Sequence, residues 1–568
     1  MPQFAHAETV PKSVEPGNIE KRFDKLETPK STLRYIIPKM EGQKAPVDAD
    51  KIKLTLSGIT IEGSTVYSKA DLEDYYAEFL SKEISAQTLF NIAAKITTKY
   101  GNDGYSLSRA IIPKQAFDKD GAAVKIEIIE GFIDAIFIEM TDADGKVLTD
   151  EKSAPKTFTD PLGFFETYKR NILAARPITA AVLERYLLLA KDLPGFDVKT
   201  VIKASPNNHR ASTLTYQIIE EIPASGSLAL DNRGTKSSGP HQISASLSAG
   251  NLTKLYENTT LSYIQTAQQH ELKYFSFSQD WNLHAEGTKL NIKAVRSLSK
   301  PGTTTLQDLD YRSLSNTLSA AISHSIIRSR GENLTLEVDF TAKNSESFQL
   351  AKRSTDDRLR KTTLTTNYDY TDAWLGVQGV SQATFDLVKG VPIFHATSND
   401  YSLNSRSDGR NDFFKAVLNL TRIQSLPDKW QLYFAAMGQR SAHGLLSGEE
   451  CGVGGESFGR AYDSSEITGD HCAAFSVELR KSFQPNIPDV KYLQPYAFYD
   501  IGVTWNRLDT TGDDKKNSLA STGLGLRFGI TDYVSGSFET ALPLTRLVDD
   551  NAVDGDHPRY FFKLTASF

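Results

Sequence analysis

Cysteine is scarce in this chain: only Cys451 and Cys472 occur among 568 residues. Two cysteines cannot build a structural zinc site of the four-cysteine type. We also find no CxxC or HExxH pair, no phosphate-binding P-loop, and no GxSxG in the strand–turn–helix context of a serine hydrolase. The ten histidines are scattered singly. The sequence therefore predicts no catalytic residue, no metal and no cofactor, and it does not favour an enzyme.

Long apolar runs are missing as well. A membrane-spanning helix needs roughly 20 consecutive apolar residues, whereas the apolar runs here are short, such as "YLLLA" at 186–190. A membrane location stays open, because the strands of a transmembrane β-barrel alternate lipid-facing and interior residues and their hydropathy averages out. No long block of Lys or Arg occurs and the net charge is −6. We therefore expect no dedicated nucleic-acid surface and no nucleic-acid partner.

The first fourteen residues leave two interpretations open. Ala5-His6-Ala7 has the small-x-small pattern of a signal-peptide cleavage site, but no apolar segment precedes it. Residues 1–14 are therefore either the remnant of a signal peptide, in which case the chain is exported, or a polar tail that contains this triplet by chance.

A short amphipathic helix is predicted over residues 15–27. Its apolar side chains recur at spacings of four and three, at Ile19, Phe23 and Leu26. The proline-containing residues 28–50 then form an irregular linker. This segment is either a disordered tail with one transient helix or a separate helix held on a tether.

Two small α+β modules follow, each with the order β-α-α-β-β. We expect the first at 51–139 and the second at 132–222, with the strand "GFIDAIFIEM" shared at their boundary. One helix of the first module shows a clear apolar stripe. The stripe consists of Leu89, Ile92, Ala93, Ile96 and Tyr100.

Residues 223–568 show no convincing helical periodicity and instead contain one alternating segment after another. At ~10 residues per strand, with connections of similar length, this region accommodates about 16 strands. A soluble β-sandwich also alternates, but a region of this length would need several such domains, and no linkers between them are visible. The pattern therefore favours an antiparallel transmembrane β-barrel of about 16 strands.

The last predicted strand, "RYFFKLTASF" at 559–568, alternates most clearly. One face carries Tyr560, Phe562, Leu564, Ala566 and Phe568, and the other carries Arg559, Phe561, Lys563, Thr565 and Ser567. The first face is apolar and the second mostly polar, as expected for lipid and for a barrel interior. We interpret Phe562, Leu564 and the terminal Phe568 as the C-terminal signal of an outer-membrane barrel.

Taken in order, several short segments resemble one protein family. They are "PGNIEKRF" in the N-terminal helix, "GYSLSRAIIPKQ" and "IEIIEGFIDAIFIE" in the first module, "LERYLLLAKDLPGF" in the second, and "DNRGTKSSG" and "HSIIRSRGENLTLEV" in the barrel. The chain resembles the outer-membrane transporters of two-partner secretion, of the haemolysin-activator type, within the superfamily that joins POTRA modules to a β-barrel. The resemblance covers nearly the whole chain. It implies that the helix at 15–27 plugs the barrel, and that the two modules are POTRA modules.

A polar segment between the two cysteines, "SFGRAYDSSEITGD" at 457–470, resembles the long sixth extracellular loop of this superfamily. The loop's signature, V-R-G-Y or V-R-G-F, stands here as Gly459-Arg460-Ala461-Tyr462. In family members the loop folds back into the barrel, and its arginine pairs with the aspartate of an aromatic-x-Asp motif. Phe498-Tyr499-Asp500 matches that motif, so the resemblance implies that Arg460 pairs with Asp500. Arginine suits this task, because its planar guanidinium can meet a carboxylate in two places.

Cys451 and Cys472 lie where strands should enter and leave this loop. In an oxidising compartment they could form a disulfide, which would contribute about 3 kcal/mol on loop-entropy grounds. The alternative is two reduced cysteines on barrel strands.

The resemblance also implies a function. The chain would lie in the outer membrane of a Gram-negative cell, with its POTRA modules in the periplasm. Its partner would be a large secreted exoprotein, captured unfolded through an N-terminal secretion domain and exported through the barrel without ATP. The barrel would contact the lipid bilayer and lipopolysaccharide, would be inserted by the barrel-assembly machinery, and would act as a monomer.

Three other functions compete with this one. An outer-membrane protein insertase of the same superfamily would carry more POTRA modules and no plug helix. A passive porin or haem-related receptor would leave residues 51–222 unexplained. A secreted enzyme with a barrel anchor would need a nucleophile motif. The identity of the exoprotein stays open, although "GRAYD" resembles the branch that includes haem–haemopexin acquisition systems.

Overall fold

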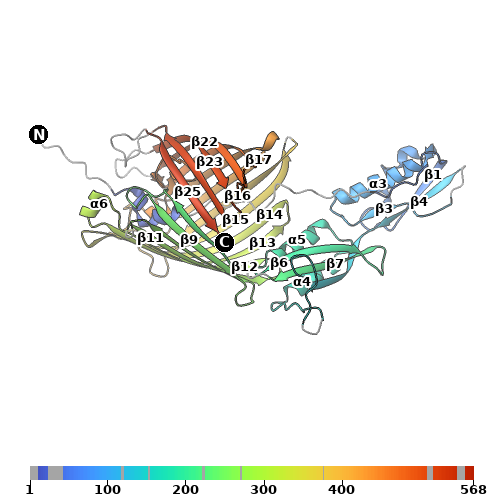
Figure 1. Ribbon diagram of the computed structural model, residues 1–568, viewed down its shortest axis with the longest axis horizontal. Coiled ribbons are helices and arrows are strands. Elements are labelled where there is room, and N and C mark those ends of the chain that lie inside the picture. The colour runs from blue at the N-terminus through green and yellow to red at the C-terminus, as the bar shows by residue number, and fades with distance from the viewer. Residues whose placement is uncertain are drawn as a thin grey trace. The chain divides into compact units, whose positions relative to one another are not determined.

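The computed structural model describes residues 10–23, 42–116, 121–150, 154–220, 224–268, 271–374, 376–507, 516–545 and 557–568. The chain divides into two compact units. One contains the N-terminal helix and the barrel, and the other contains the two α+β modules (Figure 1). Within the described residues, no helix is long and apolar enough to span a membrane.

The first module is a four-stranded sheet packed on a long helix. Its elements are β1 (Lys53–Glu62), α2 (Lys69–Glu73), η2 (Ala77–Phe79), β2 (Glu83–Ser85), α3 (Ala86–Asn102), β3 (Arg109–Ile111) and β4 (Ala122–Ile129), and its strand order is β2-β1-β4-β3. Helix α3 begins where the Ser85 hydroxyl accepts a hydrogen bond from the backbone N–H of Thr88. All five residues of the predicted stripe are buried in the core, which confirms that this face of α3 packs on the sheet.

The second module repeats this plan. It consists of β5 (Phe132–Met140), α4 (Phe164–Ala174), α5 (Ala180–Lys191), β6 (Phe196–Ala204) and β7 (Ala211–Glu220), with strand order β5-β7-β6. In both modules the first strand runs parallel to the last, and the strand before the last pairs with it antiparallel. The prediction of a shared strand is wrong, because β5 pairs with β7 and with none of the described strands of the first sheet. The first module therefore ends near Ile129, not at residue 139.

Sixteen of the described strands close into one antiparallel barrel, as predicted (Figure 1). They are β8 (Ala224–Asp231), β9 (Gln242–Gly250), β10 (Glu257–Thr266), β11 (Leu272–His284), β12 (Thr288–Ser299), β13 (Arg312–Arg328), β14 (Glu332–Gln349), β15 (Lys352–Trp374), β16 (Val377–Gly390), β17 (Phe414–Ser425), β18 (Trp430–Ser441), β21 (His471–Lys481), β22 (Tyr492–Trp505), β23 (Lys516–Gly529), β24 (Val534–Pro543) and β25 (Arg559–Ser567). Strand β25 pairs with β8 and completes the circle. Because the barrel is closed, the sheet has no unpaired edge, and its backbone N–H and C=O groups can all be hydrogen-bonded within a membrane.

The two ends of the barrel differ in the length of their connections. The connection from β17 to β18 is residues 426–429, whereas those after β16 and β18 are 391–413 and 442–470. The connection from β12 to β13 contains a short helix, α6 (Thr304–Asp308). Because outer-membrane barrels have short periplasmic turns and long extracellular loops, we call the two ends the short-turn end and the long-loop end.

Side chains alternate across the barrel wall. Tyr560 and Leu564 of β25, and Phe568 directly after it, are exposed on the outer face, and Phe562 lies half-buried on the same face. Phe561, on the other face, is only 7% exposed. This alternation agrees with the two faces predicted for "RYFFKLTASF".

Candidate functional site

Among the described residues, we find two segments that occupy the interior of the barrel. The first is the connection between β18 and β21, residues 442–470, which we call the interior loop. It contains the turn η4 (Ser447–Glu449) and a small hairpin of β19 (Cys451–Val453) and β20 (Ile467–Gly469). A disulfide joins Cys451 to Cys472 at the base of the loop. The second segment is the N-terminal helix α1 (Pro16–Lys21), preceded by η1 (Lys12–Val14).

Arg460 of the interior loop is only 4% exposed and lies among acidic side chains. Its Nη1 donates a hydrogen bond of 2.8 Å to Glu478, and its Nη2 donates one of 3.3 Å to Asp500. The carboxylate of Glu539 lies 3.5 Å from Nη1. The guanidinium also stacks over the ring of Phe498, with Cζ 3.8 Å from the ring centroid.

Asp500 holds the backbone of the loop as well as its side chain. The carboxylate accepts hydrogen bonds from the backbone N–H groups of Gly459, at 3.2 Å, and Arg460, at 3.0 Å. The Ser476 hydroxyl donates another at 2.7 Å. The structure thus brings together the predicted Arg460, Asp500 and Phe498. The fourth predicted residue, Tyr462, lies on the same loop and donates from its hydroxyl to the carbonyl of Ala520 at 3.1 Å.

The two departures from the signature have a physical explanation. Gly459 has a φ of +84°, a backbone conformation that favours glycine. A Cβ at this position would lie 2.5 Å from Cδ1 of Leu519, so a larger residue would not fit. Ala461 is fully buried. The tight turn that gives Asp500 two successive N–H groups therefore suits the residues found here.

Glu478 and Glu539 were missed by sequence reasoning, which paired Arg460 with Asp500 alone. Each is an acidic residue at an inward position of an otherwise largely uncharged strand segment, "AAFSVE" in β21 and "SFETALP" in β24. That pattern could have identified them. Burial alone lowers the pKa of the Arg460 guanidinium, but the carboxylates of Asp500, Glu478 and Glu539 outweigh it, so the pKa lies above its ordinary value. Arg460 therefore keeps its charge.

Glycines on β23 make room for the aromatic rings beside this network. A Cβ at Gly523 would lie 2.6 Å from the Phe498 ring, and one at Gly525 would lie 2.2 Å from the Tyr496 ring. With no side chains in the way, both rings lie close against β23. Arg460 stacks on Phe498, and the Tyr496 hydroxyl donates to Glu539 at 2.8 Å.

Helix α1 is held in the barrel by polar contacts with the wall. Glu20 pairs with Lys343 of β14 at 2.9 Å, and the Ser315 hydroxyl of β13 donates to Glu20 at 2.7 Å. Arg22, just after the helix, donates to the Ser238 hydroxyl at 2.9 Å. The helix is shorter than predicted, because it ends at Lys21 and not at residue 27.

The apolar residues predicted for this helix have different positions. Ile19 is buried, and the ring of Phe23 lies 4.6 Å from the ring of Tyr274 on β11. Leu26 lies outside the described residues. A sequence pattern could not find the polar contacts that Glu20 makes, since Ser315 and Lys343 lie 295 and 323 residues away in the chain.

Helix α1 also contacts the interior loop. Lys21 Nζ donates to the carbonyl of Glu450 at 2.6 Å. The backbones of Gly17 and Gly448 approach so closely that a Cβ on Gly17 would lie 2.3 Å from Cα of Gly448. Glycine at both positions permits this contact.

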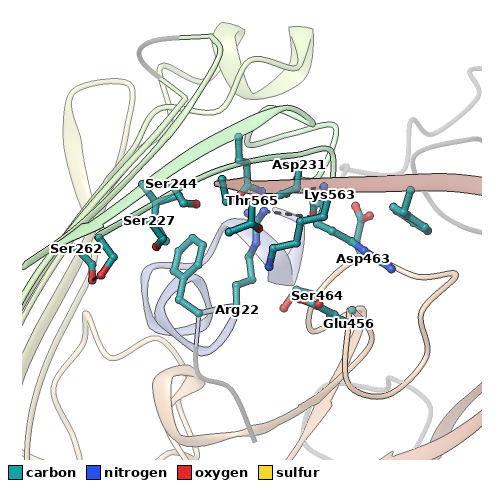
Figure 2. A pocket seen from close by; sticks show the side chains of 18 of the residues that line it. Arg22, Ser227, Asp231, Ser244, Ser262, Glu456, Asp463, Ser464, Lys563 and Thr565 are labelled. Atoms are coloured by element: carbon teal, nitrogen blue, oxygen red, sulfur yellow. Dashed lines mark hydrogen bonds between the residues drawn. The ribbon is translucent and has the colours of Figure 1, made fainter. Parts of the chain in front are cut away.

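Beside these two segments lies a cavity of about 450 Å³ (Figure 2). Arg22 extends into it, with Ser227, Ser244 and Ser262 on one side and Lys563 and Asp463 on the other (Figure 2). Polar and apolar side chains both line the cavity, and its charged residues include cations such as Arg22 and anions such as Asp463. No group of three or more metal-binding side chains occurs in the described part of the chain.

Comparison with known proteins identifies the family. Residues 212–528 match the family described as haemolysin secretion/activation protein ShlB/FhaC/HecB, and residues 54–131 match the ShlB-type POTRA domain. The first match covers more than half of the chain. The chain belongs to the ShlB/FhaC/HecB family.

Individual relatives agree with this assignment. The outer membrane transporter CdiB of Escherichia coli O6:K15:H31 is 25% identical over 537 residues, which cover 90% of this chain and 82% of the relative. The heme/hemopexin transporter protein HuxB of Haemophilus influenzae strain 86-028NP is 22% identical over 512 residues, which cover 88% and 84%. The solved structure of CdiB from Escherichia coli has the same fold, with a TM-score of 0.70, 21% identity, and coverage of 97% of this chain and 96% of that one.

Membership in the ShlB/FhaC/HecB family places the chain among the two-partner secretion transporters of the outer membrane. Its barrel lies in that membrane, and its POTRA modules lie in the periplasm. The members of this family are transporters and not enzymes.

Proposed function

We propose that this transporter captures one large unfolded exoprotein in the periplasm and exports it through the barrel to the cell surface. In this proposal the POTRA modules recognise an N-terminal secretion domain of the exoprotein. Export uses no ATP, and folding of the exoprotein outside the cell drives it. The transporter acts as a monomer, inserted by the barrel-assembly machinery and surrounded by phospholipid and lipopolysaccharide.

The edges of the module sheets support capture of an extended chain. A strand edge offers unpaired backbone groups to which an extended peptide can bind by β-augmentation, with little demand on its sequence. In the first module the edge strands β2 and β3 have only three residues each. In the second module the edge strands β5 and β6 have nine residues each. We therefore propose the second module as the main site of capture.

The barrel interior supports a gated path. Helix α1 fills part of the interior, and its ion pair and hydrogen bonds with the wall are made by polar side chains that can exchange their partners for water. We propose that α1 is the resting plug and leaves during export, whereas the interior loop stays attached through Arg460. The presence of both segments inside one closed barrel is the observation on which this proposal mainly rests.

Export of the exoprotein from cells that co-express it with the transporter tests this proposal. Deleting residues 51–222 should abolish export, while the barrel should still insert, as measured by its heat-sensitive mobility on gels. Unchanged export would overturn the proposal that the modules capture the exoprotein.

A finer experiment addresses the edge of β6. Neighbouring residues of a strand direct their N–H groups to opposite sides, so proline at Val201 and proline at Ile202 should differ. If the replaced residue donated its backbone N–H to β7, proline removes that hydrogen bond and the module should unfold. If its N–H pointed away from β7, the proline variant should fold normally. If β6 is the site of capture, the folded variant should also export several-fold less. Normal export by the folded variant would exclude the β6 edge.

A further inference from the structure

The outer face of the barrel has a recess of about 330 Å³ over β15 to β21. The strand register places Ala383, Leu420, Ala436 and Phe475 in one row across four strands. Leu420 and Phe475 are exposed, so the row faces outward. The two alanines are too small to fill the space between their larger neighbours, and this creates the recess. Because the barrel lies in the outer membrane, lipid covers this face.

A charged pair lies at one end of the recess, on the same face. Arg422 stands in the row that follows Leu420, and both of its terminal nitrogens contact Asp372, at 2.8 Å and 2.9 Å. The Ser381 hydroxyl accepts another hydrogen bond from Arg422, at 2.6 Å. The side chains of Arg422 and Asp372 remain 24% and 28% exposed, so both can be reached from outside.

This charged end lies at the level of the membrane interface. Strand β15 ends at Trp374 and β18 begins at Trp430, both at the short-turn end of the barrel. Trp374 is 60% exposed and Tyr370 is 43% exposed, on the outer face next to Arg422. Outward-facing Trp and Tyr mark the level of lipid headgroups in barrels of this kind. The recess therefore extends from the headgroup level into the hydrocarbon region.

We propose that this recess binds a single zwitterionic phospholipid that carries a primary ammonium, such as phosphatidylethanolamine. Its two acyl chains lie on either side of Leu420, one over Ala383 next to Tyr368 and the other over Ala436 next to Phe475. The phosphate lies on the guanidinium of Arg422, and the ammonium lies against the carboxylate of Asp372. The short-turn end of the barrel faces the periplasm, so the lipid belongs to the inner leaflet.

The charge of the pair decides between headgroups. Arg422 and Asp372 together are neutral, so a headgroup with one phosphate and one ammonium matches both charges. A headgroup with a net negative charge would satisfy Arg422 but would meet repulsion from Asp372. The four hydrogens on the terminal nitrogens of Arg422 are used by Asp372, Ser381 and Gln424. Within the described residues its Nε has no hydrogen-bond partner and can donate to a phosphate oxygen.

Native mass spectrometry of the full-length protein tests this site. Delipidated protein is titrated with equal concentrations of phosphatidylethanolamine and phosphatidylglycerol that have identical acyl chains. The unmodified protein should retain one phosphatidylethanolamine, about tenfold in excess over phosphatidylglycerol, as expected for one well-placed charge contact. Asp372→Asn should reverse this preference, because it leaves Arg422 as an unbalanced positive charge. Ala383→Phe should remove retention of both lipids, since the new ring fills the recess.

Arg312→Gln supplies the matched control. Arg312 is also an exposed arginine near an aspartate, Asp310 at 3.7 Å, but it lies at the long-loop end. The Arg312→Gln variant should bind phosphatidylethanolamine like the unmodified protein, whereas Arg422→Gln should lose the preference for phosphatidylethanolamine over phosphatidylglycerol. Equal retention of the two lipids by the unmodified protein, or an equal loss in Arg312→Gln and Arg422→Gln, would overturn the site. The reversal in Asp372→Asn requires a folded barrel, so misfolding cannot produce it.

Discussion

The interior loop and helix α1 share one barrel interior, but different kinds of contact hold them. The loop is attached through Arg460, which lies within 3.5 Å of Asp500, Glu478 and Glu539 and has its backbone N–H on Asp500. It also buries apolar residues such as Phe458 and Tyr462 against the wall. Helix α1 has one buried ion pair, Glu20 with Lys343, and hydrogen bonds from its cations to hydroxyl and carbonyl groups.

This difference separates a fixed element from a removable one. A buried arginine among three carboxylates is costly to extract, because the buried Asp500 would lose the cation that pairs with it. Glu478 would keep its ion pairs with Arg480 and Arg527, and Glu539 would keep its pair with Arg233. Hydroxyl and carbonyl groups lose less when water replaces a protein partner. We therefore infer that the loop and the helix respond differently to mutation.

The largest effect is expected from Arg460→Ala. The substitution leaves Asp500, Glu478 and Glu539 close together without this cation and should cost about 3–5 kcal/mol of loop attachment. Export of the exoprotein should fall by at least about tenfold, because this energy exceeds the 1.4 kcal/mol that corresponds to a factor of ten. The measurement is the amount of exoprotein in the medium at equal amounts of inserted barrel.

Arg460→Lys is its control. Lysine keeps the positive charge but has no planar guanidinium that can contact several carboxylates along its edge and stack on the Phe498 ring with its face. Export should therefore be only partly restored. Full export by Arg460→Ala would mean that the loop does not need this attachment.

The second prediction concerns removal of the helix. Deletion of residues 8–27 should raise the ion conductance of the barrel in planar bilayers, because α1 and Arg22 no longer fill the interior. Attachment of the loop should be unchanged, as measured by protection of the interior loop from protease. Unchanged conductance would mean that α1 is not a plug.

Much of this contrast could be predicted from sequence, and the limit has a physical cause. The pairing of Arg460 with Asp500 was predictable because both residues stand in short recognisable motifs. Glu478 and Glu539 have no such motif: alternation along β21 and β24 marks them as inward acidic residues, but only the register of the strands shows that they meet Arg460. The β-barrel could be predicted because the residues alternate along each strand. Alternation does not reveal which strand pairs with which, so the sequence could not show that β5 belongs to the second module alone.

The third prediction separates the ion pair of the helix from its packing. Glu20→Gln removes the charge that faces Lys343 but keeps the size of the side chain and an oxygen that accepts the hydrogen bond from Ser315. Breaking one buried charged contact should cost about 1.5–3 kcal/mol. The channel should open more often than in the unmodified protein, but less than in the deletion variant. Lys343→Met removes the other partner and should give a similar opening rate. Glu15→Gln is the control and should change the rate little, because its charged partner Lys12 lies on the same segment and glutamine can keep the hydrogen bond with Ser447 of the interior loop.

The smallest effect is expected from the disulfide. Replacing Cys451 and Cys472 by alanine removes the covalent link at the base of the interior loop. Because the link restricts the unfolded chain, its loss should lower the free energy of unfolding by about 3 kcal/mol. In the folded barrel, the β19–β20 hairpin and Arg460 still hold the loop. Export should therefore change by less than about twofold, which corresponds to a free-energy change well below about 1 kcal/mol. The unfolding temperature of the barrel should fall, and a reductant should lower it equally in the unmodified protein.

The double variant gives the sharper measurement. If Arg460 and the disulfide hold the same loop, each can keep the loop in place when the other is lost. Adding Arg460→Ala to the cysteine variant should therefore lower the protease protection of the loop by more than the sum of the two separate effects. The same cysteine substitutions combined with Glu20→Gln should give effects on conductance close to additive if the loop and the helix are held independently. Strong coupling would instead mean that the contact of Lys21 with Glu450 joins the two segments into one unit.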